Sequence, residues 1–344
     1  MNARRTAVRL IFEGVDISAD VNRYLISLSY TDNEADETDD LQLTLDDREG
    51  VWLGSWLNTP SAAKSSEIAA VIVQKNWEST GKDRVLDCGV FQVDSVNGSG
   101  PPSKVTIKAG SIPYTSTIRT QIKTKAWEQI SLSAIANEIA ATNGLACMYE
   151  SSYNPFFNRK EQLQESDITF LQRLCKNAGI SLKVTAKMIV LFDAAEYEKK
   201  DAVRVIQRGA ADVSRWSFST NLQDVSYGSC HVTYTDPQTG AVHEATYTAP
   251  DSESSGQVLE INEKVSSYGE ALTLAEKRLR EKNKSEFKAT FSLAGDTRLV
   301  AGITLDVLGY GAFDGKYIIE TATHAVSSSG YKTDITLRRV LEGY

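Results

Sequence analysis

Residues Gln164–Asp193 read QESDITFLQRLCKNAGISLKVTAKMIVLFD and predict a helix followed by a β-hairpin. Ser166 is placed to cap the helix, and Asp167 puts a negative charge at the positive end of the helix dipole. Gly179 can adopt the left-handed backbone conformation that ends a helix. Apolar residues recur with helical spacing along one side of the predicted helix: Leu171, Leu174, Cys175 and Ala178.

Two short strands are predicted directly after this helix. Ile180, Leu182 and Val184 alternate with polar residues, which is the pattern of a strand with one buried face. A second apolar run, Met188–Phe192, follows after a short turn. The helix and the hairpin therefore form a small α/β unit, which needs a further surface to bury its apolar stripe.

The length and composition indicate an ordinary globular protein with a sizeable core. The chain has 344 residues, of which 41% are hydrophobic and 24% are charged, so we expect two or three domains. The formal net charge is −8 and the pI is about 5.2. This acidic balance argues against specific nucleic-acid binding, which requires a basic surface to neutralise phosphates. It does not exclude a protein with an acidic surface past which DNA moves without binding.

The four cysteines give no sign of a metal site or of a disulfide framework. None of Cys88, Cys147, Cys175 and Cys230 lies in a C-x-x-C motif, and Cys175 falls on the apolar face of the predicted helix. We therefore expect reduced thiols in a protein that is made in the cytoplasm.

The sequence predicts neither a membrane span nor an export signal. No apolar run approaches the ~20 residues that a membrane helix needs. An apolar run follows Arg4 and Arg5, but Arg9 and Glu13 interrupt it. We expect no signal peptide and no membrane insertion by this chain.

The residues before the α/β unit, up to about 112, are rich in predicted strands. Leu41, Leu43 and Leu45 alternate cleanly with polar residues. Short strands at this spacing are typical of a barrel or a sandwich. The other strands expected here span residues 8–12, 25–30, 68–74, 84–96 and 105–108.

An acidic loop is predicted between two of these strands, at residues 31–40. It lacks the glycine at the sixth position that a calcium-binding EF-hand loop needs. Carboxylates at this density repel one another, so we expect the loop to be solvated or to face another subunit. Its acidic residues are Asp32, Glu34, Asp36, Glu37, Asp39 and Asp40.

The rest of the chain is predicted as one further α/β segment and a second strand-rich part. A helix from Leu132 stops at Asn143-Gly144, and a strand at 145–149 follows it. After about residue 210 the pattern returns to strands, interrupted by one long helix at about 268–284. The strands expected in this last part span residues 216–218, 230–234, 242–247, 287–293, 303–308, 317–324 and 331–338.

Several stretches of the chain carry a family resemblance. The helix of the opening stretch reads D-x-x-F-L-Q-R-L and closes at Ala178-Gly179, and residues 39–48 read DDLQLTLDDR ahead of Trp52. The stretches 116–140 and 271–315 match in the same order. In this set of motifs the chain resembles the phage late control D proteins, the baseplate hub proteins of contractile phage tails and related injection systems. One departure is Ala186-Lys187, where similar proteins place Asp-Gly in the hairpin turn.

The resemblance implies a mixed α+β fold, mostly β, with two tail-tube-like β-barrel domains and a smaller α/β domain between them. We expect these domains at residues 1–112, 113–209 and 210–344. It also implies a homotrimeric structural baseplate hub of the virion or of a phage-tail-like particle. Such a hub is a symmetry adaptor that joins a sixfold tail tube protein to a threefold spike protein, beside other baseplate components. The implied role involves no enzymatic chemistry and no cofactor.

The residues agree with that role, because they predict no catalytic, cofactor-binding or metal site. His243-Glu244 begins like a zinc-protease helix, but Tyr247 stands at the second histidine position, within a strand pattern. Cys230 and His231 are neighbours on a predicted strand, so they point to opposite faces and cannot form a thiol–base pair. His324 lies in a strand without a visible partner.

A glycine-rich segment at residues 309–315 also has a simpler interpretation. It imitates a dinucleotide-binding loop but has Asp314 where the third glycine belongs. Because it lies between two predicted strands, we interpret it as a hairpin turn.

Two other classes of protein stay open at this point. One is a tail-tip protein of a non-contractile phage, which shares related barrels. The other is a cell-wall hydrolase or a peptidoglycan-binding module, since residues 132–145 faintly resemble a LysM helix. A hydrolase would need a paired-carboxylate or Cys/His site, and the sequence predicts neither.

Overall fold

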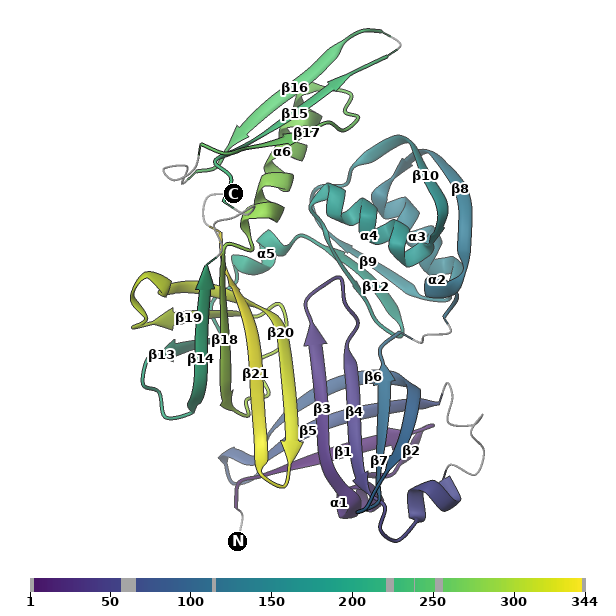
Figure 1. The fold of residues 1–344 in the computed structure, drawn as a ribbon, viewed down its shortest axis with the longest axis vertical. Helices are drawn as coiled ribbons and strands as arrows, with labels where there is room; N and C mark the ends of the chain where they lie inside the picture. Colours follow the sequence, from purple (N-terminus) through teal and green to yellow (C-terminus); the bar gives the residue numbers. More distant parts are fainter. Residues whose placement is uncertain are drawn as a thin grey trace.

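The computed structural model describes residues 3–56, 66–112, 116–220, 226–237, 239–250 and 256–341. In this part of the chain thirteen strands join into one large sheet (Figure 1). An α/β unit and a separate small sheet lie at one end of it (Figure 1). The buried apolar side chains form four separate clusters, so the core is divided among these parts.

The N-terminal part of the large sheet has strands, such as β4, along which buried and open side chains alternate. On β4, Leu41, Leu43 and Leu45 are buried, as the alternation predicts. Helix α1 (Ser18–Tyr24) and the short π-helix Trp52–Trp56 lie beside these strands. The strands are β1 (Arg5–Phe12), β2 (Val15–Asp16), β3 (Leu25–Asn33), β4 (Asp40–Asp46), β5 (Glu67–Ser79), β6 (Lys82–Ser99) and β7 (Lys104–Gly110).

The C-terminal part of the large sheet buries a cluster of aromatic rings. Phe218 packs against Phe291 and stacks on Phe313. The segment 309–315 is a turn between two strands, as predicted, and includes a 3-10 helix at Gly311–Phe313. The strands are β13 (Arg204–Gln207), β14 (Val213–Thr220), β18 (Phe287–Ala294), β19 (Thr304–Leu308), β20 (Gly315–Ser327) and β21 (Gly330–Arg339).

The two parts of the large sheet repeat one strand pattern. The strand order is β14-β18-β21-β20-β3-β4-β7-β6, and every neighbouring pair is antiparallel. We call β14, β18, β21 and β20 the C-terminal half-sheet, and β3, β4, β7 and β6 the N-terminal half-sheet. In each half-sheet the first strand in the chain pairs with the second, the second with the fourth, and the fourth with the third.

The register shows that this repeat extends to single residues. Leu43 pairs with Ile107 in one half-sheet, and Phe291 pairs with Ile335 in the other. Both half-sheets carry a β-bulge at the same place, between Val93 and Ser95 in β6 and between Ile319 and Thr321 in β20. In each case the third strand also pairs with an additional strand, β5 or β19. The two half-sheets are therefore structural copies with little similarity in sequence.

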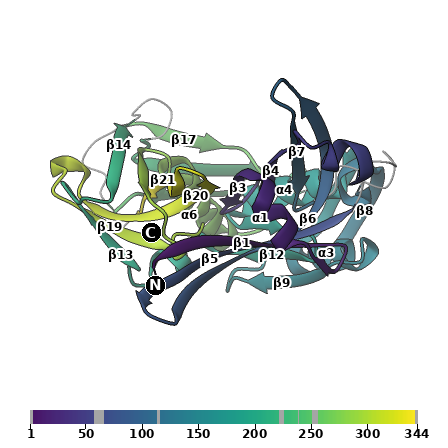
Figure 2. The ribbon, with the colours of Figure 1, turned by 90° about the horizontal axis from the view of Figure 1, so that it is seen from below.

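The prediction of two separate β-barrels is not confirmed. β20 of the C-terminal half-sheet pairs with β3 of the N-terminal half-sheet, from Thr321↔Asn33 to Ser327↔Ser27. In two separate barrels, each of these edge strands would have to pair within its own barrel. Here the two edge strands pair with each other and join the halves. β1 and β5 cross behind the joined strands and cover one face of the N-terminal half-sheet (Figures 1 and 2). No closed barrel is formed within the described ranges.

The α/β unit between the two halves contains the stretch that opens the sequence analysis. Helix α4 (Asp167–Ala178) begins at Ser166, whose side chain accepts a hydrogen bond from Thr169 N–H, and ends at Gly179 with φ +63°. The predicted apolar stripe is buried, and β11 (Ser181–Val184) and β12 (Met188–Phe192) form the predicted hairpin. The Thr185 hydroxyl accepts hydrogen bonds from Lys187 and Met188 N–H, so the turn closes without Asp-Gly.

The sequence analysis missed other elements of this unit. β8 (Ile122–Ser131) and β10 (Phe156–Ser166) form a two-stranded antiparallel ribbon. Their mostly exposed side chains give no clean two-residue alternation. Helix α2 (Thr117–Thr120) and helix α5 (Ala194–Glu198) were not predicted either, whereas α3 (Leu132–Thr142) and β9 (Ala146–Glu150) confirm the helix predicted from Leu132 and the strand predicted at 145–149.

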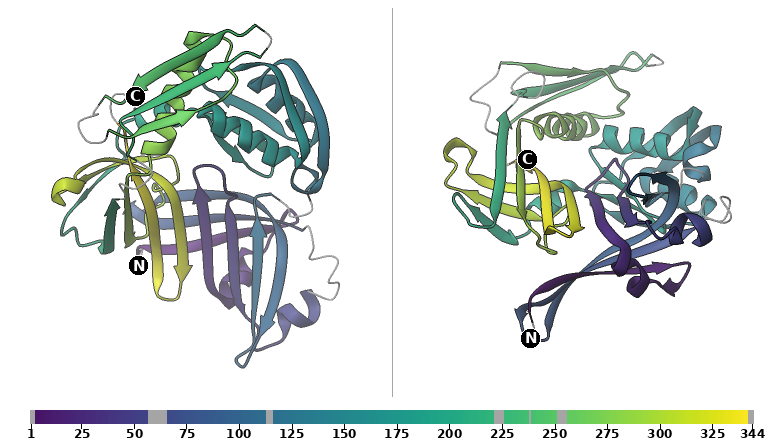
Figure 3. Two further views of the ribbon diagram at one scale, coloured as in Figure 1. Left: turned by 45° about the horizontal axis from the view of Figure 1, so that its top comes forward. Right: turned by 60° about the horizontal axis from the view of Figure 1, so that its bottom comes forward.

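A separate small sheet is inserted between the first and second strands of the C-terminal half-sheet. β15 (Ser229–Thr235) pairs with β16 (Val242–Thr248) and with β17 (Val258–Ile261), and none of the three joins the large sheet. The predicted long helix is α6 (Tyr268–Asn283), which buries Ala271, Ala275 and Leu279 against this sheet. Figure 3 shows α6 between the small sheet and the rest of the molecule. The predicted second barrel therefore does not include these strands.

Candidate functional site

One face of the joined half-sheets is open and is covered by small polar side chains. Along β3, Leu28 and Tyr30 are buried, whereas Ser27, Ser29 and Thr31 lie on the other face. The same alternation continues across the neighbouring strands, which lie side by side in Figure 1. The polar residues of this face include Ser217, Thr290, Thr336, Thr321, Thr323, Ser27, Ser29, Thr31, Gln42, Thr44, Thr106, Ser95 and Asn97. The same registers place Lys104, Lys108, Arg215 and Lys332 on this face together with Asp46 and Asp334, so the face is hydrophilic and carries mixed charge.

A buried ion-pair cluster ties this sheet to the α/β unit and to α6. Arg338 of β21 has only 1% of its side chain exposed and forms an ion pair with Glu198 of α5. Glu198 also accepts a hydrogen bond of 2.6 Å from Arg280 of α6. Arg338 further contacts Glu34 at 3.2 Å and Glu320 at 3.9 Å.

Opposite charges offset part of the cost of burial in this cluster. Burial alone would lower the pKa of Arg338, but Glu34 and Glu198 outweigh it and the net pKa is raised. Burial raises the pKa of Glu34, while Arg338 acts against that shift. Each charge in the cluster therefore depends on the others, and removal of one would leave a buried charge without compensation.

A second cluster is centred on Lys183 of β11. Its ammonium group lies 2.6 Å from Asp32 and 3.2 Å from Asp39, and it also donates to the carbonyl of Asn33. Asp32 in turn accepts a hydrogen bond from Ala301 N–H of the C-terminal part. Lys183 therefore holds the α/β unit, the N-terminal half-sheet and the segment after β18 together.

Two carboxylates share the one ammonium group of Lys183. Burial raises the pKa of Asp39 to about 6, and the neighbouring charge of Asp32 adds to that rise, although Lys183 opposes it. Burial would lower the pKa of Lys183, but the two carboxylates outweigh it and raise the pKa. The charge of Asp39, and with it the charge of this cluster, is therefore expected to change near pH 6.

A third contact fixes α6 against the end of α4. Lys277 donates a 2.7 Å hydrogen bond to Asp193, whose other oxygen caps α5. A Cβ atom placed on Gly179 would lie 2.7 Å from the Cβ of Lys277, so the two helices approach too closely for any side chain at this position. Arg278 of α6 also donates to Asn177 at 3.2 Å.

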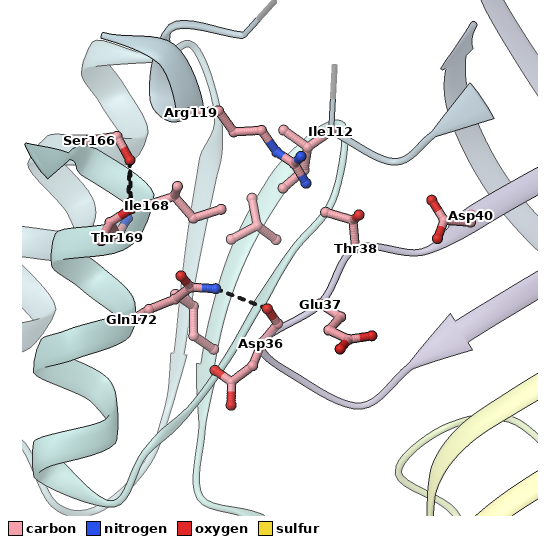
Figure 4. Close-up of a pocket in the computed structure, with 12 residues that line it drawn as sticks. Asp36, Glu37, Thr38, Asp40, Ile112, Arg119, Ser166, Ile168, Thr169 and Gln172 are labelled. Carbon is pink, nitrogen blue, oxygen red and sulfur yellow. Dashed lines mark hydrogen bonds between the residues drawn. The ribbon is translucent and has the colours of Figure 1, made fainter. Parts of the chain in front are cut away.

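A hollow of about 380 Å³ opens between the acidic loop and the α/β unit (Figure 4). We call it the acidic hollow. Gln172 of α4 donates a 2.9 Å hydrogen bond to the carbonyl of Asp36 across it (Figure 4). Its lining combines apolar residues with charged ones: Ile112, Ile168, Leu182 and Val184 with Asp36, Glu37, Asp40 and Arg119.

The prediction that residues 31–40 form a solvated or subunit-facing loop is wrong for three of the acidic residues. Asp32, Glu34 and Asp39 are largely buried because Lys183 and Arg338 neutralise them. These cations lie 151 and 304 residues away from Asp32 and Glu34, so no local pattern could announce the pairing. The side chains of Asp36, Glu37 and Asp40 are exposed, as predicted.

The structure also places the residues that the sequence analysis considered for catalysis. His243 lies in β16 and not in a helix. Cys230 is buried in the small-sheet core, while His231 points to the other face and contacts Glu260 at 2.9 Å. Within the described residues no group of His, Cys, Asp and Glu side chains is arranged to hold a metal ion.

His324 is buried under the joined half-sheets, where it has a structural role. Its Nε2 lies 2.9 Å from the carbonyl of Leu299, its Nδ1 lies 2.7 Å from the Tyr331 hydroxyl, and its ring stacks on Tyr30. Burial lowers the pKa of His324 to about 4, so the ring is neutral at pH 7.

Sequence reasoning missed the charged residues that join the parts. Lys183 occupies the polar position of an alternating strand, where a solvent-exposed lysine is the normal expectation. Glu198 lies in a short helix that the sequence analysis did not predict. Only the tertiary structure brings Lys183 to Asp32 and Asp39, and Glu198 to Arg338.

The polar face and the ion-pair clusters belong to a protein assembled from several coupled parts. Residues 77–330 match the family model described as phage tail baseplate hub (GPD). This match covers most of the chain, and the chain therefore belongs to the phage tail baseplate hub family. The family is structural and non-enzymatic, in agreement with the prediction that the chain is not an enzyme.

Two curated relatives have the same description. The chain is 28% identical over 189 residues to the probable baseplate hub protein of Escherichia phage 186, and 30% identical over 189 residues to that of Escherichia phage P2. These alignments cover 55% and 54% of this chain but only 45% of each relative. The chain thus aligns with about half of the length of the curated relatives.

Solved structures share the fold over almost the whole chain. The tail protein from Neisseria meningitidis MC58 has a TM-score of 0.71 at 10% identity, with 97% of both chains covered. The 43 kDa tail protein of prophage MuSo2 from Shewanella oneidensis has a TM-score of 0.68 at 14% identity, with 97% of this chain and 98% of that chain covered. A type VI secretion component from E. coli has a TM-score of 0.56 at 11% identity over 93% of this chain and 75% of its own.

A membrane span would need a helix that is both long and apolar. In the described part of the chain, none has both the length and the apolar character needed to cross a bilayer.

Proposed function

We propose that the chain is a symmetry adaptor of a contractile tail or a phage-tail-like particle, in which three copies form a closed ring between a sixfold tail tube and a threefold spike. The observation that carries this proposal is the internal repeat of the half-sheets. A ring of three chains presents six similar half-sheets but only three α/β units. Such a ring has an approximate sixfold surface and a strict threefold surface at the same time.

The free edges of the repeat supply the contact between copies. Within the chain, β20 is the third strand of one half-sheet and pairs with β3, the first strand of the other. The equivalent contact between two chains would pair β6 of one copy with β14 of the next. Among the described strands, β14 pairs only with β18, and residues beyond Val93 in β6 pair only with β7. These edges would be covered in a closed ring.

The two ends of the half-sheets differ in the symmetry that they offer. The β6–β7 and β20–β21 turns are equivalent in the repeat, and the strand register places both at one end. Figure 3 shows that end opposite the α/β unit. We therefore assign the turn end to the tail tube and the end with the α/β unit and α6 to the spike and other baseplate components.

The open polar face is the surface that would line the axial channel. The opposite face is covered by β1, β5 and the apolar clusters, so it is not available. Basic side chains on this face, such as Lys108 and Lys332, are mixed with acidic ones such as Asp46 and Asp334, so a passing polyanion would meet mixed charges and not a purely cationic surface. The four free cysteines fit assembly in the bacterial cytoplasm.

We also propose that the chain folds as three units, close to the division expected at residues 112/113 and 209/210. The second boundary would fall near residue 200, because β13 (Arg204–Gln207) pairs with β19. Limited proteolysis of the purified chain tests this division.

A disulfide cross-link between copies tests the ring. In the repeat, Asn97 of β6 corresponds to Thr323 of β20, and Ser219 of β14 corresponds to Thr31 of β3, which pairs with Thr323. The double variant Asn97→Cys/Ser219→Cys is therefore expected to give covalent trimers in assembled particles under oxidation.

The control pairs Asn97→Cys with Thr290→Cys, which lies one strand further from the free edge and should not cross-link. Particle imaging gives the copy number. Six copies per baseplate, a cross-link from the control pair alone, or a position in a tail without a sheath would contradict the proposal.

A further inference from the structure

The seam between the two half-sheets of one chain shows which side chains such a contact buries. On the buried face, His324 of β20 lies opposite Tyr30 of β3, and the two rings stack. Val326 lies opposite Leu28 in the same seam. None of these four side chains is more than 8% exposed. The seam therefore closes with an apolar and aromatic contact in addition to its strand pairing.

The free edge strand β14 carries aromatic rings at the equivalent positions. The repeat places Phe218 at the position of Tyr30 and Trp216 at the position of Leu28. Trp216 is 46% exposed, whereas Leu28 is 1% exposed. The indole packs against Phe218 and Tyr310 of its own chain and leaves the rest of its surface open. A surface that is buried in the internal seam is thus exposed at this edge.

The free edge of β6 carries a leucine where the internal seam has a histidine. Gly98 of β6 occupies the position of His324 in the repeat. A Cβ atom built on Gly98 would lie 3.1 Å from the side chain of Leu53. Leu53 therefore occupies the space into which a side chain at Gly98 would extend. It is 44% exposed, so much of its side chain remains available for a further contact.

Leu53 is held in this place by its neighbours in the short π-helix. The buried carboxylate of Asp47 accepts hydrogen bonds from Trp52 N–H at 2.7 Å and from Leu53 N–H at 3.4 Å. The Trp52 ring is buried in the N-terminal apolar cluster, where it packs edge-to-face against Tyr24. An anchored segment therefore presents the leucine at the edge of β6.

The strand pairing that two copies could form is shorter than the internal seam. The internal seam pairs seven residues of each strand. β6 ends at Ser99, and Pro101 and Pro102 in the turn after it have no N–H group to donate. Within the described strands, the equivalent pairing between copies spans only residues 96–99 of β6. Side-chain contacts must therefore supply much of the affinity between copies.

We propose that Leu53 of one copy packs on Phe218 and Trp216 of the next copy and closes the seam between the chains. Leu53 then takes the place that His324 has in the internal seam. Six strands separate β14 from β6, and the two strands lie on opposite sides of the joined half-sheets, so the contact forms between chains (Figure 1). Single exposed apolar residues are common on protein surfaces, and here it is the repeated register that brings two of them together. The inference rests on the proposed ring and names the side chains that join its copies.

A photo-cross-linker at position 53 tests the contact directly in assembled particles. Leu53 is replaced by p-benzoyl-phenylalanine, and the products of irradiation are separated by size and mapped by mass spectrometry. We expect products of two or three chains that are joined between residue 53 and residues 216–218. The same probe at Leu163, an exposed leucine of β10, is the control and should give no product with residues 216–218. A product within one chain, or none with residues 216–218, would overturn the proposal.

A charge substitution and its rescue test whether this contact holds the ring together. In the Asn97→Cys/Ser219→Cys chain, Leu53→Asp is expected to lower the yield of covalent trimers roughly tenfold, because the new carboxylate would be buried against aromatic rings. Addition of Trp216→Lys should restore the yield, since the carboxylate then meets a cation. Leu163→Asp is the control and should keep the full yield. Melting temperatures of the isolated chains check that each variant folds.

The outcomes separate this contact from the ring itself. A full yield of trimers with Leu53→Asp would leave the ring in place and contradict the role of Leu53. A loss that Trp216→Lys does not reverse would show that Leu53 meets a different surface. If the Asn97/Ser219 cross-link does not form in chains that keep Leu53, the ring is wrong and the contact is wrong with it.

Discussion

Arg338 and Glu198 lie 140 residues apart in the sequence and form an ion pair whose side chains are only 1% and 3% exposed. Arg338 belongs to β21, the last strand of the large sheet, and Glu198 belongs to α5, the last helix of the α/β unit. Because Glu198 also binds Arg280 of α6, three separately packed cores meet at one carboxylate. At this point the α/β unit, the large sheet and α6 are thus joined by charge.

Loss of the Arg338 guanidinium group should therefore be costly. Arg338→Met is expected to lower the free energy of unfolding by about 3–5 kcal/mol, because Glu198 and Glu34 would be left buried without their cation. Chemical denaturation monitored by circular dichroism measures the change. As a control, Arg48→Met removes an exposed pair with Asp46 and should leave the free energy of unfolding nearly unchanged. Equal costs for the two variants would show that the cluster contributes nothing special.

Lys183 should control the docking of the α/β unit. Lys183→Met is expected to increase amide exchange in residues 32–40 and in β11, because Asp32 and Asp39 lose their shared cation. Hydrogen exchange followed by mass spectrometry measures this, with Lys187→Met in the exposed hairpin turn as the control. Unchanged exchange in residues 32–40 would mean that other contacts hold the loop.

Two effects of a side chain at Gly179 can be measured separately: the contact between α4 and α6, and the strain of the left-handed backbone conformation. Gly144 and Gly179 both have a left-handed φ, +70° and +63°, but only Gly179 has a neighbour in the way of a side chain. Gly144→Ala should cost about 1–2 kcal/mol from the backbone alone. Gly179→Ala should cost more, since the new Cβ would meet Lys277. Thermal unfolding compares the two, and equal costs would show that α6 moves aside freely.

The apolar stripe of α4 gives a direct test of the core of the α/β unit. Leu171 and Leu174 are 0% and 1% exposed. Truncation of either residue to alanine should cost about 2–5 kcal/mol. Lys176→Ala, on the exposed side of the same helix, serves as the control and should be nearly neutral. An unchanged melting temperature in both leucine variants would contradict the packing.

His324 predicts a pH dependence with a defined sign. Its pKa is lowered from 6.5 to about 4 in the folded chain, so the unfolded chain binds more protons between these values. Stability should therefore fall by up to about 3 kcal/mol as the pH drops from 6.5 to 4. In His324→Gln this loss should be smaller, and the difference from the unmodified chain isolates the histidine from other groups. His243→Gln should keep the full pH dependence; if it does not, the assignment to His324 is wrong.

The local structure could be read from the sequence wherever one face of an element is buried. The stripe of α4, its cap at Ser166 and its end at Gly179 follow from residue spacing and backbone preference, and the structure confirms each of them. The alternation of Leu41, Leu43 and Leu45 likewise predicted β4. The ribbon of β8 and β10 was missed because both of its faces are largely exposed.

The relations between distant strands could not be read in the same way. The pairing of Thr323 with Thr31 joins two strands of ordinary polar alternation, and nothing local distinguishes this seam from an exposed edge. The repeat of the half-sheets is equally hidden, since Leu43 and Ile107 correspond to Phe291 and Ile335 without similarity in sequence. Backbone register preserves the repeat while the side chains have diverged.

The covalent link between the two half-sheets also determines where insertions can occur in an assembly. In an assembly of six identical single half-sheets, any insertion would appear six times around the axis. Because β15–β17 and α6 are inserted in only one of the two copies, they appear once per pair. Two similar half-sheets in one chain thus allow an insertion to be present at half the number of positions that the half-sheets occupy. Each half-sheet can also mutate without the same change in the other.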